Sequence, residues 1–399
     1  MQKRDYLDEL ISVSGTQDIK VITGVRRSGK SVLLDLFADY ITNHVENYNI
    51  IFIKLNNLDY EDLLEYHALN DYIENHYMDG KHNFLFIDEV QMCKDFERTI
   101  NSLHDSGKYD IYITGSNAFL LSSDLATLFT GRVYQIKIFP FSYREYSEYF
   151  AKLGRSVNIN DYIMEGGLAG SYPYEELRQK YNYIANTYDT LILRDIQKKY
   201  NIKNISLLES VSNFMLNNIS KKTSIRSIAD TLSTNTKENH HSTVGNYIDY
   251  LCNAFAFYKI PRYDINGKQY LASQDKYYLS DHCFRFAKLG TKTQDYGRVL
   301  ENIVAIELMR RGYEIYVGVL RDSEVDFVAK KRDEKFFIQV SYDITKQETF
   351  EREIAPFMSI KDASPKILIA DTRHPEYIHD GIHVIDIAEW LSGKIELIM

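Results

Sequence analysis

A glycine-rich phosphate-binding loop is the feature that most constrains how this chain folds. The loop occupies residues 24–31 and reads GVRRSGKS. An apolar stretch at 19–23 precedes it, and a stretch with helical apolar spacing follows from Val32. A strand, a glycine loop and a helix start together form an anion site, because backbone N–H groups and the helix dipole point at bound phosphates. The sequence therefore predicts a nucleotide-binding α/β domain.

The residue types of the loop indicate which positions contact the nucleotide. Gly24 and Gly29 permit backbone angles and a close approach that a Cβ atom would block. Lys30 is expected to reach the β- and γ-phosphates, and the Ser31 hydroxyl is expected to bind Mg²⁺. For Arg27, simple exposure to solvent is the alternative. The predicted nucleotide-binding residues are Gly24, Arg27, Ser28, Gly29, Lys30 and Ser31.

An acidic strand end supplies the second nucleotide motif. Residues 83–89 read NFLFIDE, a buried apolar strand followed by two carboxylates. In open parallel sheets, ligands bind at the carboxyl edge. We expect Asp88 to hold Mg²⁺ together with Ser31, and Glu89 to act as the general base toward the attacking water. The chain has no Asn-Lys-x-Asp guanine motif, so ATP is the expected nucleotide.

Two further polar positions are candidates for catalysis. Residues 110–117 read DIYITGSN, and Ser116 or Asn117 is a candidate to contact the γ-phosphate or orient water; a plain turn after a strand is an equal alternative. Arg132 is a candidate sensor or arginine finger that neutralises charge on the transferred phosphoryl group, in its own subunit or in a neighbour. A surface arginine without such a role is the alternative.

Hydrophobic patterning extends the α/β prediction through residue 140. Apolar stretches alternate with helical patterns, which favours a parallel sheet covered on both faces. Residues 174–218 read as helices, and a long helix begins near 293, followed by four short strands and more helix. The predicted strands of the first region are 19–23, 49–55, 84–88, 110–114 and 133–138.

The motifs together resemble a known family. GVRRSGKS, LFIDEVQ, ITGS and TGRVYQIKIFPFSYREY look like the prokaryotic AAA-type ATPases that carry a C-terminal domain of unknown function, and the resemblance covers nearly the whole chain. It implies an α/β P-loop core of the additional-strand class, a helical lid, a winged helix and a restriction-endonuclease-like α/β domain. We place these four parts at 1–150, 151–218, 219–290 and 291–399.

Residues 220–280 independently read as two short helices followed by a β-hairpin, the order of a winged helix. The hairpin tip is Asn266-Gly267. Residues 196–276 contain eleven Lys and Arg against six Asp and Glu, a local net charge of +5 in a chain of net charge −9. This excess favours DNA contact through residues 219–290. Packing against protein is the alternative, because the candidate reading helix from His241 is not itself basic.

The tail carries an incomplete nuclease pattern. Glu301 on a helix and Asp326 on a strand match the PD-(D/E)xK arrangement, which needs two acids for Mg²⁺ and a nearby Lys. Gln339 stands where the second acid belongs, and Ser341 stands where the Lys belongs. Nuclease activity is therefore not expected, and a binding or regulatory role is favoured. The alternative is that another charged residue has taken over, from the set Glu324, Lys330 and Lys331.

Composition limits the class of protein. The chain is 44% hydrophobic, yet no apolar run approaches the length of a membrane span, and the N-terminus is too polar for a signal peptide. The three cysteines are scattered and suggest a reducing compartment. We expect a cytoplasmic ATPase that uses ATP and Mg²⁺ and drives or switches a DNA- or protein-directed process. A slow nucleotide switch or scaffold and a DNA-processing enzyme with a divergent nuclease domain are the alternatives.

Overall fold

The computed structural model describes residues 4–115, 129, 131–232, 241–291 and 295–397, without the side chains of 191–193 and 272–273. The candidates Ser116 and Asn117 lie outside these residues. The chain divides into two compact units, Met1–Ile138 and Phe139–Met399. The division falls before the boundary expected near residue 150, because the helix that begins at Tyr143 belongs to the second unit.

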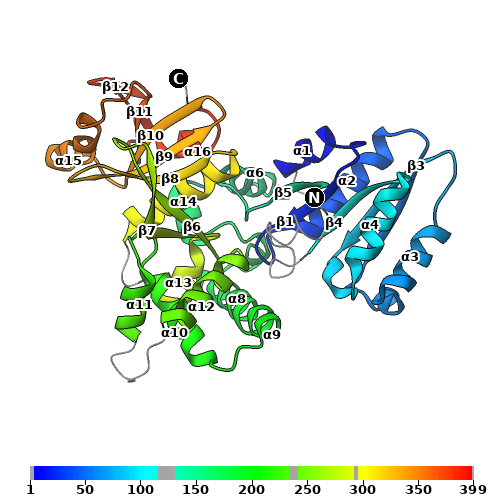
Figure 1. The fold of residues 1–399 in the computed structure, drawn as a ribbon. Coiled ribbons are helices and arrows are strands. Elements are labelled where there is room, and N and C mark those ends of the chain that lie inside the picture. Colours follow the sequence, from blue (N-terminus) through cyan, green and yellow to red (C-terminus); the bar gives the residue numbers. More distant parts are fainter. Residues whose placement is uncertain (1–3, 116–128, 130, 233–240, 292–294, 398–399) are drawn as a thin grey trace. The chain divides into compact units, whose positions relative to one another are not determined.

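The first unit is built on a five-stranded parallel sheet with the order β2-β3-β4-β1-β5 (Figure 1). The strands are β1 (Ile19–Thr23), β2 (Tyr48–Lys54), β3 (His82–Asp88), β4 (Tyr109–Thr114) and β5 (Val133–Lys137). They agree with the predicted strands within one or two residues. Strand β4 lies between β1 and β3, which is the additional strand that the resemblance implies.

Helices cover both faces of this sheet, as the alternating pattern predicted. They are α1 (Tyr6–Ser12), α2 (Lys30–His44), α3 (Tyr66–Asn75) and α4 (Phe96–Ser106), with short 3₁₀ turns η1 (Leu58–Leu63) and η2 (Val90–Met92). On one face, Ile87 and Ile113 join a buried cluster with side chains of α3 and α4. On the other face, Phe86 and Tyr112 pack against Phe37 of α2. Neighbouring strand residues point to opposite faces, so both layers are apolar.

The second unit combines helices with an eight-stranded mixed sheet of order β12-β13-β11-β10-β9-β8-β6-β7. Its strands are β6 (Phe257–Asp264), β7 (Gln269–Leu279), β8 (Glu314–Val319), β9 (Glu324–Lys331), β10 (Glu334–Ser341), β11 (Lys366–Ala370), β12 (Tyr377–His379) and β13 (Ile382–Asp386). Its α-helices are α6 (Tyr143–Lys152), α7 (Ile159–Glu165), α8 (Leu177–Asp189), α9 (Gln197–Tyr200), α10 (Ile205–Asn217), α11 (Ile225–Leu232), α12 (His241–Asn253), α13 (Cys283–Leu289), α14 (Tyr296–Arg310), α15 (Gln347–Met358) and α16 (Ile387–Leu391). A 3₁₀ turn, η3 (Ala169–Ser171), and a π-helical segment, η4 (Thr190–Ile196), complete it.

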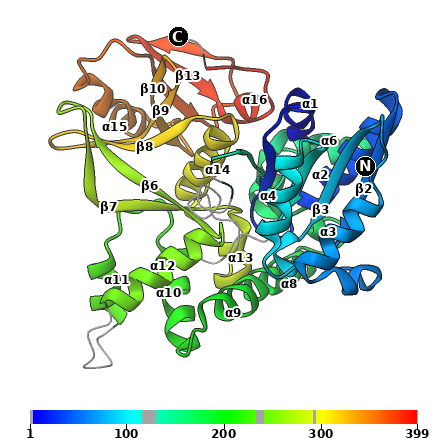
Figure 2. The ribbon, with the colours of Figure 1, turned by 45° about the vertical axis from the view of Figure 1, so that its right-hand side comes forward.

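The predicted hairpin is present, but it is part of the tail sheet. Strands β6 and β7 pair antiparallel around the Asn266-Gly267 tip, and β6 also pairs parallel with β8 through Arg262 and Val317. Figure 2 shows the long hairpin between helices α10–α12 and the remaining tail strands. The edge of a strand presents unpaired backbone N–H and C=O groups that can hydrogen-bond to another strand. Here β6 pairs with β8, so the hairpin and the tail form one sheet across the boundary expected at residue 290. Six strands, rather than four, follow α14 in the described residues.

Candidate functional site

The phosphate-binding loop connects β1 to α2 at the carboxyl edge of the parallel sheet. Gly29 is the N-cap residue of α2 and has a left-handed backbone with φ of 95°, which glycine adopts without strain. Among the described residues, no side chain caps this helix end. At Gly24, a Cβ atom would lie 2.2 Å from the carbonyl oxygen of Ile138. Both predicted glycines are therefore required by geometry, and the first N–H groups of α2 lack a side-chain cap, as an anion site needs.

The ammonium group of Lys30 lies inside the loop. Its Nζ donates to the carbonyl oxygens of Gly24 at 3.1 Å and Val25 at 3.3 Å, and the residue is buried. A phosphate oxygen is a stronger acceptor for an ammonium group than a carbonyl oxygen. The buried hydroxyl of Ser28 has no hydrogen-bond partner within the described chain. These polar atoms fit a bound triphosphate. Arg27 lies exposed on the loop, with φ of 64°.

A hydroxyl from β4 contacts the Asp88 carboxylate and the Glu89 backbone at the end of β3. Thr114 Oγ1 donates to Asp88 Oδ1 and accepts a hydrogen bond from the Glu89 backbone N–H at 3.1 Å. Because β4 lies between β1 and β3, Thr114 ends the strand that separates the loop from the acids. Sequence reasoning missed Thr114. The available signal was its position as the last residue of the strand, two residues before the candidate Ser116.

Glu89 is held in an uncommon backbone conformation. Its φ is 57°, which costs free energy in a non-glycine residue and is often found at functional sites. The Gln91 side-chain amide donates to Glu89 Oε2 at 2.5 Å. The carboxylate is therefore oriented by its neighbour, as a general base has to be.

The donor set for Mg²⁺ is small but chemically suitable. Ser31 lies half-buried in the first turn of α2, and the Asp88 carboxylate is buried. Hydroxyl and carboxylate oxygens are ligands that Mg²⁺ accepts, and in nucleotide sites the phosphates supply further ligands. No group of three or more metal-ligating side chains suited to a metal ion occurs in the described residues.

Arg132 lies at the opposite edge of the sheet. Its carbonyl oxygen accepts from the N–H of Ile19 at the start of β1, and its guanidinium group forms an ion pair with Asp105 in the last turn of α4. Strands β1 and β5 run parallel in register, and five residues of strand span roughly 15 Å. This placement contradicts a role for Arg132 at the phosphate loop of its own chain. The role in a neighbouring subunit stays a prediction.

The second unit contains an acid centre with a lysine that sequence reasoning missed. Lys276 comes from β7, and its Nζ lies 2.9 Å from Glu301 Oε1, 2.9 Å from Glu324 Oε1 and 3.5 Å from Asp326 Oδ1. Ser341 occupies the lysine position of the nuclease pattern, but Lys276 of the hairpin supplies a positive charge beside the acids. Glu324 converges on the centre, as the alternative required. No local motif could have revealed Lys276, because the strand that carries it meets the tail only in the folded sheet.

The other predicted tail residues have structural partners. The Gln339 side-chain oxygen accepts from the Asp326 N–H at 3.1 Å, and its amide donates to Glu353 at 3.2 Å. Ser341 is buried and donates to the Asp343 carbonyl oxygen. The two alternative cations lie elsewhere: the Lys330 ammonium lies 3.9 Å from the ring centre of Tyr263, and the Lys331 ammonium donates to a backbone carbonyl.

Burial and charge shift the pKa values in the acid centre. Burial raises the pKa of Glu301 to about 8, with a further increase from the charge of Asp326 and a decrease from Lys276. Burial also raises the pKa of Asp326. Burial opposes the charge of Lys276, but the three surrounding carboxylates outweigh it and raise the pKa of this lysine. The lysine is therefore charged at neutral pH.

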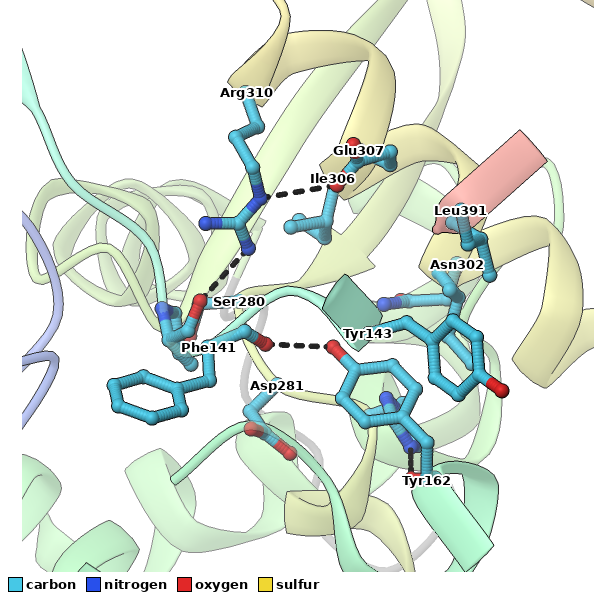
Figure 3. A pocket seen from close by; sticks show the side chains of 13 residues that line it. Phe141, Tyr143, Tyr162, Ser280, Asp281, Asn302, Ile306, Glu307, Arg310 and Leu391 are labelled. Atoms are coloured by element: carbon cyan, nitrogen blue, oxygen red, sulfur yellow. Dashed lines mark hydrogen bonds and ion pairs between the residues drawn. The ribbon is translucent and has the colours of Figure 1, made fainter. Parts of the chain in front are cut away.

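One cavity of the second unit is too small for a ligand. Figure 3 shows its lining, where Tyr162 donates to the carbonyl oxygen of Phe141 at 2.7 Å. Arg310 also donates to the carbonyl oxygen of Pro140 at 2.7 Å. The cavity volume is about 10 Å³, which holds about one water molecule. The hydrogen bonds around this cavity connect helices α7 and α14 to the segment before α6.

Comparison with known proteins gives three matches along the chain. Family models match an AAA domain at residues 16–147, a domain of unknown function (DUF8612) at 157–295 and a domain of unknown function (DUF4143) at 296–390. An uncharacterized protein of Haemophilus influenzae is 35% identical over 98% of this chain and 98% of its own length. An uncharacterized protein of Methanocaldococcus jannaschii is 28% identical over 86% of this chain and 79% of its own length.

Among solved structures, domain III of the Thermotoga maritima replication initiation protein DnaA is similar with a TM-score of 0.29 and 17% identity. The similarity covers 49% of this chain and 89% of that chain. In the described residues, no helix is long and apolar enough to cross a membrane. The AAA domain implies nucleotide binding and hydrolysis. The chain belongs to the prokaryotic family in which an AAA-type P-loop ATPase domain is followed by the DUF8612 and DUF4143 domains.

Proposed function

We propose that the protein binds ATP with Mg²⁺ and hydrolyses it with release of the γ-phosphate. We further propose that hydrolysis drives or switches a DNA- or protein-directed process. The observation that carries this proposal is the linkage at the carboxyl edge of the sheet. Thr114 contacts the Asp88 carboxylate and the Glu89 backbone N–H, one strand away from the loop that surrounds Lys30. An acid for the metal, an acid for water and a cation for phosphate are the parts that phosphoryl transfer to water requires.

Each side chain has one role in this proposal. Lys30 binds the β- and γ-phosphates, and the N–H groups of the loop surround the same oxygens. Ser31 and Asp88 would hold Mg²⁺, which neutralises charge on the phosphate oxygens when it is bound. Glu89 accepts a proton from the attacking water, Gln91 orients its carboxylate, and Thr114 holds the Asp88 carboxylate.

ATP turnover by the full chain tests the proposal. Turnover is measured with and without Mg²⁺, and with and without single- and double-stranded DNA. We expect Mg²⁺-dependent release of phosphate. Strong stimulation by DNA supports a DNA-directed process, whereas slow turnover that DNA does not change supports a nucleotide switch. Absence of ATP binding at millimolar nucleotide contradicts the proposal.

Helices α10–α12 and the β6–β7 hairpin support DNA as a partner. Their order is that of a winged helix, and the basic excess of residues 196–276 lies in this region. The predicted apolar helix face is buried, at Val244, Tyr247, Ile248 and Leu251. Exposed Asn246 and Asp249 alternate with it on α12. The region is therefore available for DNA contact, with a protein partner as the other outcome of a binding test.

A DNA-processing enzyme with a divergent nuclease tail is the second candidate. The convergence of three carboxylates on Lys276 favours it, because acids and a lysine are the components of such a site. The same geometry opposes metal-dependent cleavage. The ammonium group lies where the carboxylates converge and offsets part of their charge, and Lys222 also pairs with Glu324 at 2.7 Å. We therefore propose a binding or regulatory role for the tail.

A further inference from the structure

The segment before α1 reaches the phosphate-binding loop through a buried arginine. Arg4 is 1% exposed, and its Nη1 donates to the carbonyl oxygen of Ser28 at 2.6 Å. The guanidinium carbon lies 5.4 Å from the ring centre of Tyr6, and the Arg4 carbonyl oxygen accepts from the Leu7 N–H. These contacts fix the side chain against the loop, 24 residues away in sequence.

The guanidinium group also lies directly against Gly29. A Cβ atom at Gly29 would be 2.6 Å from Arg4 Nη1, well inside van der Waals contact. Gly29 therefore serves two geometric needs, its left-handed backbone with φ of 95° and the space that Arg4 occupies. The contact joins Arg4 to the Ser28–Gly29 peptide unit, one residue before the peptide bond that leads into Lys30.

The direction of this peptide unit follows from its planarity. The Ser28 carbonyl and the Gly29 N–H belong to one peptide unit, and none of the peptide bonds in the described residues is cis. In a trans peptide the C=O and N–H bonds point in opposite directions. A carbonyl oxygen held by Arg4 therefore turns the Gly29 N–H to the opposite side. A cation on the carbonyl also polarises the peptide unit and strengthens its N–H as a donor.

We propose that Arg4 is a positioning residue of the nucleotide site. Its guanidinium group holds the Ser28–Gly29 peptide so that the Gly29 N–H faces the bound phosphates. It also places a permanent positive charge on the side of the loop opposite the phosphates, because arginine stays protonated in proteins. The inference rests on the proposed ATP site, and it adds a residue outside the loop motif to that site.

Substitution of Arg4 in the full chain tests the inference. The variants Arg4→Ala and Arg4→Gln are titrated with a fluorescent ATP analogue, and thermal unfolding without nucleotide is recorded for each. Arg4→Ala is expected to weaken binding about tenfold, within the range for loss of a hydrogen bond to a charged group. Arg4→Gln keeps a donor but removes the charge and the planar fork, so an intermediate loss is expected. The matched control is Arg373→Ala, which removes an exposed arginine of the tail.

Rescue distinguishes positioning from general support of the fold. Guanidinium ion at about 20 mM, far below denaturing concentrations, should restore part of the ATP affinity of Arg4→Ala by entering the vacated space. The same concentration of NaCl should not. Neither salt should improve binding by wild type or by Arg373→Ala.

The outcomes separate the inference from the proposed function. Binding of the analogue by wild type and equally by both Arg4 variants overturns the role of Arg4. A lower unfolding temperature with unchanged affinity also overturns it, because that result describes a structural residue only. If Arg4→Ala does not fold, the affinity of Arg4→Gln decides, and a wild-type value overturns the inference. Lack of binding by wild type instead contradicts the ATP site itself.

Discussion

The phosphate edge of the first unit and the acid centre of the second unit each hold a buried lysine among oxygen atoms, with opposite consequences. Lys30 donates to two backbone carbonyl oxygens, which are neutral. Lys276 lies among three carboxylates, whose charge stabilises it. An incoming phosphate improves the partners of Lys30, whereas it would meet repulsion at the acids around Lys276. The comparison indicates that the neighbours of a buried lysine, and not the lysine alone, decide whether the site suits a phosphate.

The largest expected effect concerns Glu89. In Glu89→Gln, the amide keeps the shape but cannot accept a proton from water, so ATP turnover should fall about 10²–10⁴-fold. ATP-Mg²⁺ affinity should stay near the wild-type value. Steady-state phosphate release and equilibrium nucleotide titration measure the two quantities. Turnover at the wild-type rate would exclude Glu89 as the base.

Removal of Lys276 should unfold the acid centre. Lys276→Met removes the cation that pairs with Glu301 and Asp326, whereas Glu324 keeps its ion pair with Lys222. Loss of one partner of a buried ion pair typically costs about 3–5 kcal/mol. Denaturant unfolding of the full chain, followed by a probe of the second unit, measures the loss. Lys331→Met, on β9 of the same sheet, is the control because Lys331 is exposed and its ammonium group donates to a backbone carbonyl instead of the acids. Equal stability of the two variants would contradict a stabilising role for Lys276 in the acid centre.

The pH dependence of that loss has a definite sign. Burial raises the folded-state pKa of Glu301 from 4.5 to about 8. A carboxyl group with a raised folded pKa contributes stability that is complete below its unfolded pKa and is lost as pH rises through the folded value. Lys276 lowers this pKa in the wild type. The deficit of Lys276→Met should therefore be larger at pH 8 than at pH 5, and a deficit independent of pH would contradict this account.

At the phosphate edge, Lys30→Ala should weaken ATP binding by more than tenfold. The variant loses a charge-assisted contact worth roughly 1.5–3 kcal/mol, while the loop backbone keeps its fold. Titration with a fluorescent nucleotide measures the affinity, and thermal unfolding without nucleotide is the control for folding. Affinity within a factor of about three of wild type would argue against the loop assignment.

The acid centre should not cleave DNA. With Lys276 among the carboxylates, neither linear nor supercoiled DNA is expected to be cut by the full chain with Mg²⁺. Agarose gels of plasmid substrates provide the measurement. Nicking that disappears in Asp326→Ala would establish the nuclease alternative. It would also show that the acid centre around Lys276 acts on a ligand, contrary to the comparison with Lys30.

The smallest effect is expected at Arg132. Because it lies at the edge of the sheet away from the loop of its own chain, Arg132→Ala should leave ATP affinity unchanged. Turnover should also be unchanged if the arginine is only a surface residue. If Arg132 acts in a neighbouring subunit, turnover falls, and mixing with Glu89→Gln restores part of it through composite sites. A loss of turnover that mixing does not restore would contradict both placements.

Local sequence determined the phosphate edge because its geometry is made by neighbours in the chain. A strand, two glycines and a helix start fix the loop within residues 19–31, and the acids follow directly after their own strand. The same local rules placed the five parallel strands within one or two residues. They also located the hairpin tip at Asn266-Gly267, where the turn itself requires these residue types.

Tertiary structure decided which distant residues meet. Thr114 contacts Asp88 and the Glu89 backbone because β4 inserts between β1 and β3. Arg132 lies away from the phosphate-binding loop because parallel strands keep the two edges of the sheet apart. Arg4 reaches the loop across 24 residues, and Lys276 reaches the acids because β6 pairs with β8 in one sheet. Spacing along a chain carries no signal for such contacts, since side chains far apart in sequence are brought together only by the packing and pairing of whole elements.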